Sequence, residues 1–172
     1  MIRLLAMLLA VLLCSWSASA GRAGAAGNQV EIAADLAAIR ACLEMQRKRR
    51  EKDTCIGRIS EMCRDQPSDE IVSARTYFCA ARETAAWDQL LNRNFQAQVD
   101  AIRGDDVSDQ ALRDGQLGAL RTAQRRWIQF RDAEMIREEK NSQNAMSTWI
   151  LANVEKVGLE MTARRAIDLS LD

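Results

Sequence analysis

Apolar residues recur every three or four positions along most of this chain, which is the spacing of amphipathic helices. A clear case begins at Val30, where Ile32, Leu36, Ile39 and Leu43 fall on one helix face. Strand signals are missing, because no run alternates with period two and β-branched residues are sparse. The pattern therefore predicts an all-α protein.

Further helices are predicted on either side of Pro67, the only proline. A short helix over residues 55–63 precedes it, and long helices follow over roughly residues 71–103 and 109–140, with a last helix over 145–169. The stripe of the last helix consists of Ile150, Val154, Val157 and Met161. A short turn joins the two long helices, so they are expected to pack antiparallel. The predicted fold is an antiparallel helical bundle of about four to five helices.

Capping residues mark the predicted ends of the long helices. Ser68, followed by two acidic residues, is typical of the N-cap of the first long helix. Gly104 suits the C′ position at its other end. Ser108 or Asp106 can cap the second long helix, and residues 141–142 offer a break after it.

The first twenty residues have the layout of a cleavable secretory signal. Arg3 gives a positive start, residues 4–13 form an apolar run, and a small-x-small exit ends at Ala20. The apolar run is too short for a spanning helix, so cleavage after Ala20 is expected. Residues 21–30 are Gly-rich and expected to be a flexible stub, and residues 31–172 are expected to form a single helical domain.

Four cysteines remain outside the leader: Cys42, Cys55, Cys63 and Cys79. In an exported protein an even set indicates two disulfides, whereas the wide gaps and the absence of histidine disfavour zinc. Sequential pairing, Cys42–Cys55 with Cys63–Cys79, suits two helix–turn–helix units and is preferred. The alternative, Cys42–Cys79 with Cys55–Cys63, requires a bridge over about 12 Å along one helix.

Charge and composition exclude several function classes. The 24 basic and 24 acidic residues balance, so no global field favours nucleic acid or anionic lipid. Without histidine the chain lacks the commonest general base, and neither a phosphate-binding loop nor a nucleophile elbow is present. The charged run 47–53 is interpreted as a solvated helix end or loop. We therefore expect no enzyme, no cofactor and no metal site.

Two polar–aromatic segments place charged side chains on helix faces that should pack against other helices. Antiparallel register about the turn near Asp105 brings the two segments opposite one another. It predicts an ion pair between Glu83 and Arg131, and a contact of Asp88 with Gln124 or with the Trp127 indole. A buried charge needs such a partner, because an isolated one costs several kcal/mol.

The same segments resemble the N-terminal domain of LprI-type lysozyme inhibitors, which are small exported helical domains of bacteria. The resemblance spans roughly residues 55–169 and ends in the segment Thr162-x-x-Arg165. The residues of its two central motifs are Cys79, Glu83, Trp87, Asp88, Leu91, Asn92, Gln124, Trp127, Arg131 and Asp132. The family usually has two further cysteines at positions that are Met135 and Val157 here, as expected if a packing contact replaced a disulfide.

The resemblance implies an exported, periplasmic or secreted binding protein that inhibits lysozyme. The alternative is a structural or adaptor domain of the bacterial envelope without that activity. A third interpretation is a small-molecule carrier with a cleft near Trp127 and Trp149. Lysozymes are typically basic, so the candidate partner-binding turn is the one containing Asp105, Asp106 and Asp109, whose acids also suit helix capping. Neither nucleic acid nor stable membrane insertion after signal cleavage is expected.

Overall fold

The computed structural model describes residues 29–143 and 148–171. The chain divides into two compact units, residues 1–34 and residues 35–172. In the first unit the described residues are helical. The predicted signal peptide and most of the predicted stub lie outside the described residues. All sites discussed below belong to the second unit.

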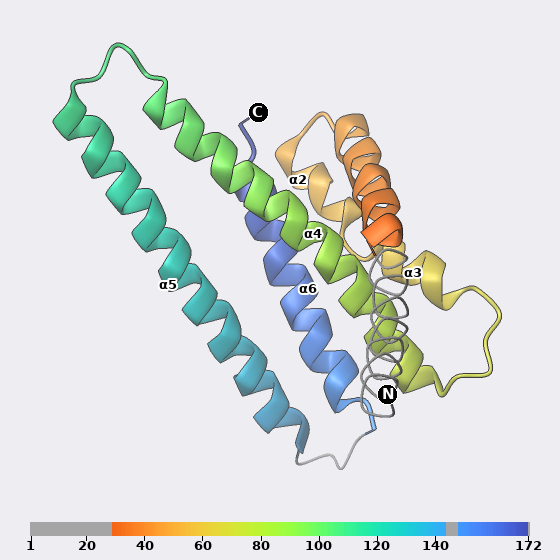
Figure 1. The fold of residues 1–172 in the computed structure, drawn as a ribbon. Helices are drawn as coiled ribbons and strands as arrows, with labels where there is room; N and C mark the ends of the chain where they lie inside the picture. The colour runs from red at the N-terminus through yellow and green to blue at the C-terminus, as the bar shows by residue number, and fades with distance from the viewer. Residues whose placement is uncertain (1–28, 144–147, 172) are drawn as a thin grey trace, which may run out of the picture. The chain divides into compact units, whose positions relative to one another are not determined.

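The second unit is built from helices (Figure 1). Residues 35–45 are helical, and the later elements are α2 (Arg49–Lys52), the 3₁₀ turn η1 (Asp53–Cys55), α3 (Arg58–Arg64), α4 (Val72–Arg103), α5 (Gln110–Gln143) and α6 (Ile150–Asp168). The described residues contain no strand, and the predicted all-α bundle is confirmed. Within this described part, no helix combines the length and the apolar character that crossing a membrane requires.

The two long helices do not pack mainly on one another. They run in opposite directions, as expected, but α6 packs extensively against both of them, and α4 and α5 meet only sparsely (Figure 1). The expectation of direct packing between α4 and α5 is therefore wrong. The α4–α5 turn fixes the relative direction of the two helices, while the insertion of α6 decides their separation.

Small side chains explain how α6 fits between two neighbours. Its buried residues are Ala152, Gly158, Leu159, Thr162, Ala163, Ala166 and Ile167. The expected stripe through Val154 and Met161 is only partly buried. A helix packed on two sides needs short side chains on both, because these decide how closely helix axes approach.

The N-termini of the long helices differ from the predicted caps. Ser68 does not cap α4, which follows Ile71, and its hydroxyl instead accepts a hydrogen bond from the N–H of Glu70 (3.1 Å). In α5 the cap is Asp109, whose carboxylate accepts from the N–H of Leu112 (2.8 Å). Several short polar side chains lie at both turns and could cap the helix that follows. The backbone geometry decides which of them reaches the free N–H groups.

The C-terminal ends also depart from expectation. Gly104 ends α4 with a φ of −85°, so it is not in the left-handed conformation that a C′ glycine usually adopts. Helix α5 continues through the expected break at residues 141–142. There the buried Ser142 hydroxyl donates to the Glu138 carboxylate one turn earlier (2.9 Å), which supports the last turn of the helix.

Gly57 divides the short helix that was predicted over residues 55–63. Its φ of +91° is unfavourable for residues with a side chain, and it separates η1 from α3. Both preferred disulfides are nevertheless present and confirm the sequential pairing. Cys42–Cys55 has a Cα separation of 5.9 Å, and Cys63–Cys79, which joins α3 to α4, has one of 5.7 Å.

Candidate functional site

Glu83 is a fully buried carboxylate in the middle of α4. Its Oε1 accepts hydrogen bonds from the N–H of Gly57 (2.7 Å) and from the indole N–H of Trp87 (2.9 Å). Its Oε2 accepts from the N–H of Ser60 (2.8 Å). The expected ion pair with Arg131 is not formed, because three N–H donors satisfy both oxygens instead.

Two of the three donors to Glu83, the N–H groups of Gly57 and Ser60, come from the start of α3, and the third, the Trp87 indole, lies on α4 itself. The first N–H groups of a helix have no acceptor within the helix, and a carboxylate at that end is also favoured by the helix dipole. Gly57 precedes α3, and its backbone conformation places its own N–H on the same carboxylate. Glu83 and Trp87 therefore anchor α3 on α4, a structural role.

The α5 motif contacts α6 instead of α4. Arg131 pairs with the neighbouring Asp132 (2.9 Å) and lies over the Trp127 ring, 5.2 Å from its centroid. Arg165 of α6 also lies over that ring (5.9 Å), and its Nε donates to the side-chain oxygen of Gln124 (3.1 Å). These contacts replace the expected ones to α4 because α6 occupies the space between.

The remaining α4 motif residues divide between core and surface. Leu91 is buried in the core. Asp88 accepts a hydrogen bond from the amide of Asn92 one turn later (3.0 Å), where contact with Gln124 or Trp127 was expected. Asp88 thus remains on the side of α4 that faces the space between the long helices.

A cleft of about 430 Å³ lies between α4, α5 and α6. Three of the motif residues, Asp88, Arg131 and Asp132, contribute to its walls. The other lining residues are Ala81, Thr84, Ala85, Met135, Glu155, Gly158 and Thr162. The cleft exists because α6 holds the long helices apart and because many of the facing side chains are small.

The charges of this cleft are predominantly negative. Its carboxylates are Asp88, Asp132 and Glu155, and Arg131 is the only cation in its lining. The Thr84 hydroxyl donates to Glu155 across the α4–α6 contact (2.7 Å). Sequence reasoning placed Thr162 in the closing segment of the family resemblance, but it predicted no cleft that contains Thr162, Thr84 and Glu155, because the face that α6 turns towards α4 depends on long-range packing.

Met135 and Gly158 make a close contact at the junction of α5 and α6. A Cβ added to Gly158 would lie 3.0 Å from the Met135 methyl carbon. The sequence predicted that Met135 and Val157 replace a family disulfide by packing. Met135 packs on Gly158, the residue next to Val157, and the replacement of a disulfide by a contact between Met135 and Val157 stays a prediction.

Replacing Gly158 by leucine is expected to lower the free energy of unfolding by about 1–3 kcal/mol, because the larger side chain must push α5 from α6. Gly158→Ala meets only the flexible end of Met135 and gains about 1 kcal/mol of helix propensity, so it should be nearly neutral. Gly118→Leu on α5 is a matched control, since its added Cβ has open space. Equal urea midpoints for the two leucine variants would contradict this packing.

The turn between α4 and α5 contains the three acidic residues that the sequence singled out. Asp105 accepts hydrogen bonds from the Ser108 hydroxyl (2.6 Å) and the Val107 N–H (3.0 Å). These bonds hold the pKa of the Asp105 carboxyl below its ordinary value of 3.8. Their contribution to stability is present above that value and is lost as the pH falls through the lowered pKa. Asp109 serves as the cap of α5.

Two residues of the turn are directed to solvent. Asp106 is exposed, and its carboxylate forms no hydrogen bond or ion pair with the described residues. Val107 is 97% exposed, the largest exposed fraction among the big apolar side chains of the described chain. The turn therefore presents an apolar tip beside a free carboxylate, held by the internal bonds of Asp105.

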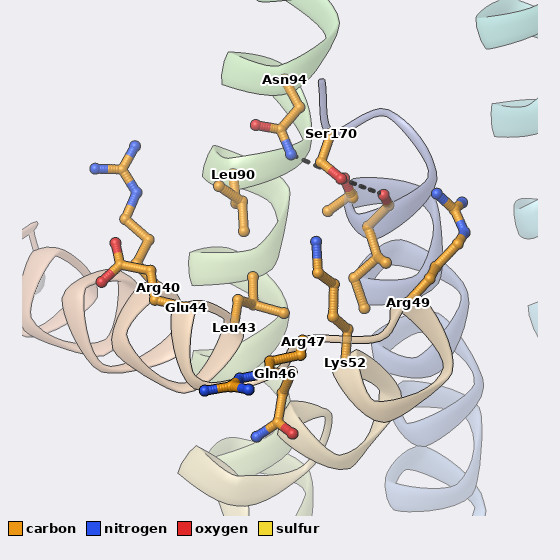
Figure 2. Close-up of a pocket in the computed structure, with 12 residues that line it drawn as sticks. Arg40, Leu43, Glu44, Gln46, Arg47, Arg49, Lys52, Leu90, Asn94 and Ser170 are labelled. Atoms are coloured by element: carbon orange, nitrogen blue, oxygen red, sulfur yellow. Dashed lines mark hydrogen bonds between the residues drawn. The ribbon is translucent and has the colours of Figure 1, made fainter. Parts of the chain in front are cut away.

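A larger cleft, of about 600 Å³, lies where α2, α4 and the C-terminal end of α6 meet. Figure 2 shows Lys52 reaching from α2 towards Ser170, with Arg40 on the opposite side and Arg49 beside α6. Arg47 lies after the helix over residues 35–45 and also lines the cleft. The cleft was not predicted, because its walls come from distant parts of the sequence.

Several polar groups of this basic cleft are bound within the protein. Arg49 forms an ion pair with Asp168, so the charged run 47–53 is tied to α6 and is not simply a solvated helix end. The Asn94 amide donates to the Ala166 carbonyl (2.8 Å) at the end of α6 (Figure 2). These contacts fasten α2 to α6 and α6 to α4.

The comparisons with known proteins identify one family. The family model for the lysozyme inhibitor LprI matches residues 63–169, which is more than half of the 172-residue chain. The match includes both motif segments, the α4–α5 turn and all the residues of the cleft between α4, α5 and α6. No curated protein and no solved structure matches the chain.

Proposed function

Because this chain belongs to the LprI family of lysozyme inhibitors, we propose that it is an exported, non-catalytic protein that binds and inhibits lysozyme. The proposal agrees with the secretory layout of residues 1–20 in the sequence. It also agrees with the two disulfides, which persist in oxidising compartments outside the cytosol.

The observation that carries the proposed surface is the exposure of Val107 between acidic neighbours. A basic partner is attracted by carboxylates at the rim of a contact, and an exposed apolar side chain supplies buried area at its centre. The turn projects from the end of the two longest helices (Figure 1), so it can reach into a concave partner without a rearrangement of the bundle.

The internal bonds of the turn decide which substitutions test binding. Asp105 and Asp109 hold the turn and cap α5, so changing them would alter its conformation as well as its charge. The side chains of Asp106 and Val107 have no such role, and the bond from the Val107 N–H to Asp105 is kept when the Val107 side chain is changed. We expect the double change Asp106→Asn with Val107→Ser to raise the inhibition constant for lysozyme about tenfold, equivalent to about 1.4 kcal/mol.

The measurement is inhibition of cell-wall clearing by a basic lysozyme, titrated with the oxidised protein at low and high salt. Asp69→Asn, an exposed acid before α4, is the charge-matched control and should leave inhibition unchanged. If the native chain inhibits lysozyme and the double variant has the same inhibition constant, the assignment of binding to this turn is wrong. A native chain that fails to inhibit at large excess would favour the envelope-adaptor function.

A further inference from the structure

We propose that the cleft between α4, α5 and α6 is a binding site for a primary alkylammonium group, the chemical group of a lysine side chain. This site is separate from the α4–α5 turn, and its existence does not depend on lysozyme inhibition. The charges of the cleft, one buried hydroxyl and the size and shape of the lining all favour such a ligand.

The charge of the cleft favours a cation. Arg131 is paired with Asp132, which leaves Asp88 and Glu155 as the carboxylates without a cationic partner in the cleft. Thr84 and Asp88 are one turn apart on α4, and the Thr84 hydroxyl is bonded to Glu155. The two carboxylates therefore lie on the same side of the cleft, with α4 and α6 each supplying one. A cation placed between them would interact with both.

A buried hydroxyl in the cleft points to the same ligand. Thr162 lines the cleft and is fully buried, yet its Oγ1 has no hydrogen-bond partner among the described residues. Such groups are rare in folded proteins, because an unsatisfied buried hydroxyl costs about 1–3 kcal/mol. An ammonium has three N–H donors and no acceptor, which suits two carboxylates and one hydroxyl oxygen.

The lining of the cleft suits the alkyl chain behind the charge. Ala81, Ala85 and Gly158 leave room, and the flexible Met135 side chain can adjust to an apolar chain. The volume of about 430 Å³ lies within the range of small-molecule sites. A guanidinium is planar and presents its donors as a fork, so it fits these acceptors less well than an ammonium does.

The test is a titration of the full oxidised chain with n-butylamine at neutral pH, followed by NMR of the Met135 methyl group and the Gly158 amide. Butan-1-ol supplies the same chain without the charge, and n-butylguanidinium supplies the planar cation. We expect saturable shifts with butylamine, weaker binding of the guanidinium and no saturable shift with butanol. Equal behaviour of butylamine and butanol would overturn the proposal.

Substitutions in the cleft test whether the named residues bind butylamine. Asp88→Asn and Glu155→Gln should each weaken butylamine binding about tenfold, as expected for the loss of one charge-assisted contact. Thr162→Val should weaken it less, while raising the thermal midpoint of the free protein because an unpartnered hydroxyl is removed. Glu61→Gln, an exposed acid outside the cleft, is the control.

Each variant must keep the unfolding midpoint and the near-UV spectrum of a folded protein, and the three cleft variants provide independent readings. Unchanged affinity in both carboxylate variants would show that butylamine binds elsewhere. Shifts that spread over all acidic surfaces and vanish at moderate salt would show only nonspecific attraction. Either result would refute the site without bearing on lysozyme inhibition by the turn.

Discussion

Replacement of Glu83 by alanine is expected to lower the free energy of unfolding by about 3–5 kcal/mol. Three N–H donors, those of Gly57, Ser60 and Trp87, would lose their acceptor in a fully buried place. Each donor left unsatisfied costs about 1–3 kcal/mol. The loss should be greatest where α3 docks on α4.

The substitution Glu83→Gln removes the negative charge but keeps the size and shape of the side chain, so it measures the contribution of the charge separately. A glutamine keeps one carbonyl oxygen but places an NH₂ group against an N–H donor, so we expect a loss of about 2 kcal/mol. Guanidinium chloride unfolding of the oxidised protein is the measurement. Glu61→Gln on α3 is the matched control, and it should stay within about 0.5 kcal/mol of the native protein. Equal losses in the two glutamine variants would contradict the role of Glu83.

Removal of the disulfides is the second change with a large expected effect. The bonds close loops with sequence separations of 13 and 16 residues, and each should contribute about 3 kcal/mol by restricting the unfolded chain. The loss of both, about 6 kcal/mol, is comparable with the lower end of the stability of a typical domain, about 5–15 kcal/mol. A chain that lacks both bridges is expected to be only marginally folded at physiological temperature.

Paired serine variants measure the two bridges separately, Cys42→Ser with Cys55→Ser and Cys63→Ser with Cys79→Ser. Their unfolding free energies should each fall by a similar amount, because the loops are similar in length. The Cys63–Cys79 pair and Glu83 both fasten α3 to α4, so their losses should be less than additive when combined. Strict additivity would mean that the bridge and the carboxylate stabilise different contacts.

The positions of the helices could largely be predicted from the sequence, since the signals for them are local. The 3.6-residue period predicted both long helices to within a few residues of Val72–Arg103 and Gln110–Gln143. Loop length and helix rise were enough to choose the disulfide pairing. Capping residues were less decisive, because neighbouring turn residues such as Ser108 and Asp109 offer equivalent acceptors and only the backbone selects one.

The partners of the motif residues could not be predicted in this way. The prediction paired Glu83 with Arg131 on the assumption that helices joined by a short turn are neighbours. In the structure Glu83 is bound by α3, while Arg131 lies with Trp127 and Arg165 beside α6. This error has one long-range cause, the insertion of α6 between the two long helices. The insertion changes which residues of α4 and α5 can lie opposite one another.

The sequence by itself determined the helices, the two disulfides and the acidic α4–α5 turn, because hydrophobic period, loop closure and turn chemistry act over a few residues. Only the tertiary structure decided that Asp88, Arg131 and Glu155 share a cleft and that Glu83 anchors α3. These outcomes depend on where α6 lies, and its small buried residues permit close packing on two helices at once. The position of α6 depends on packing contacts between residues that are far apart in the sequence.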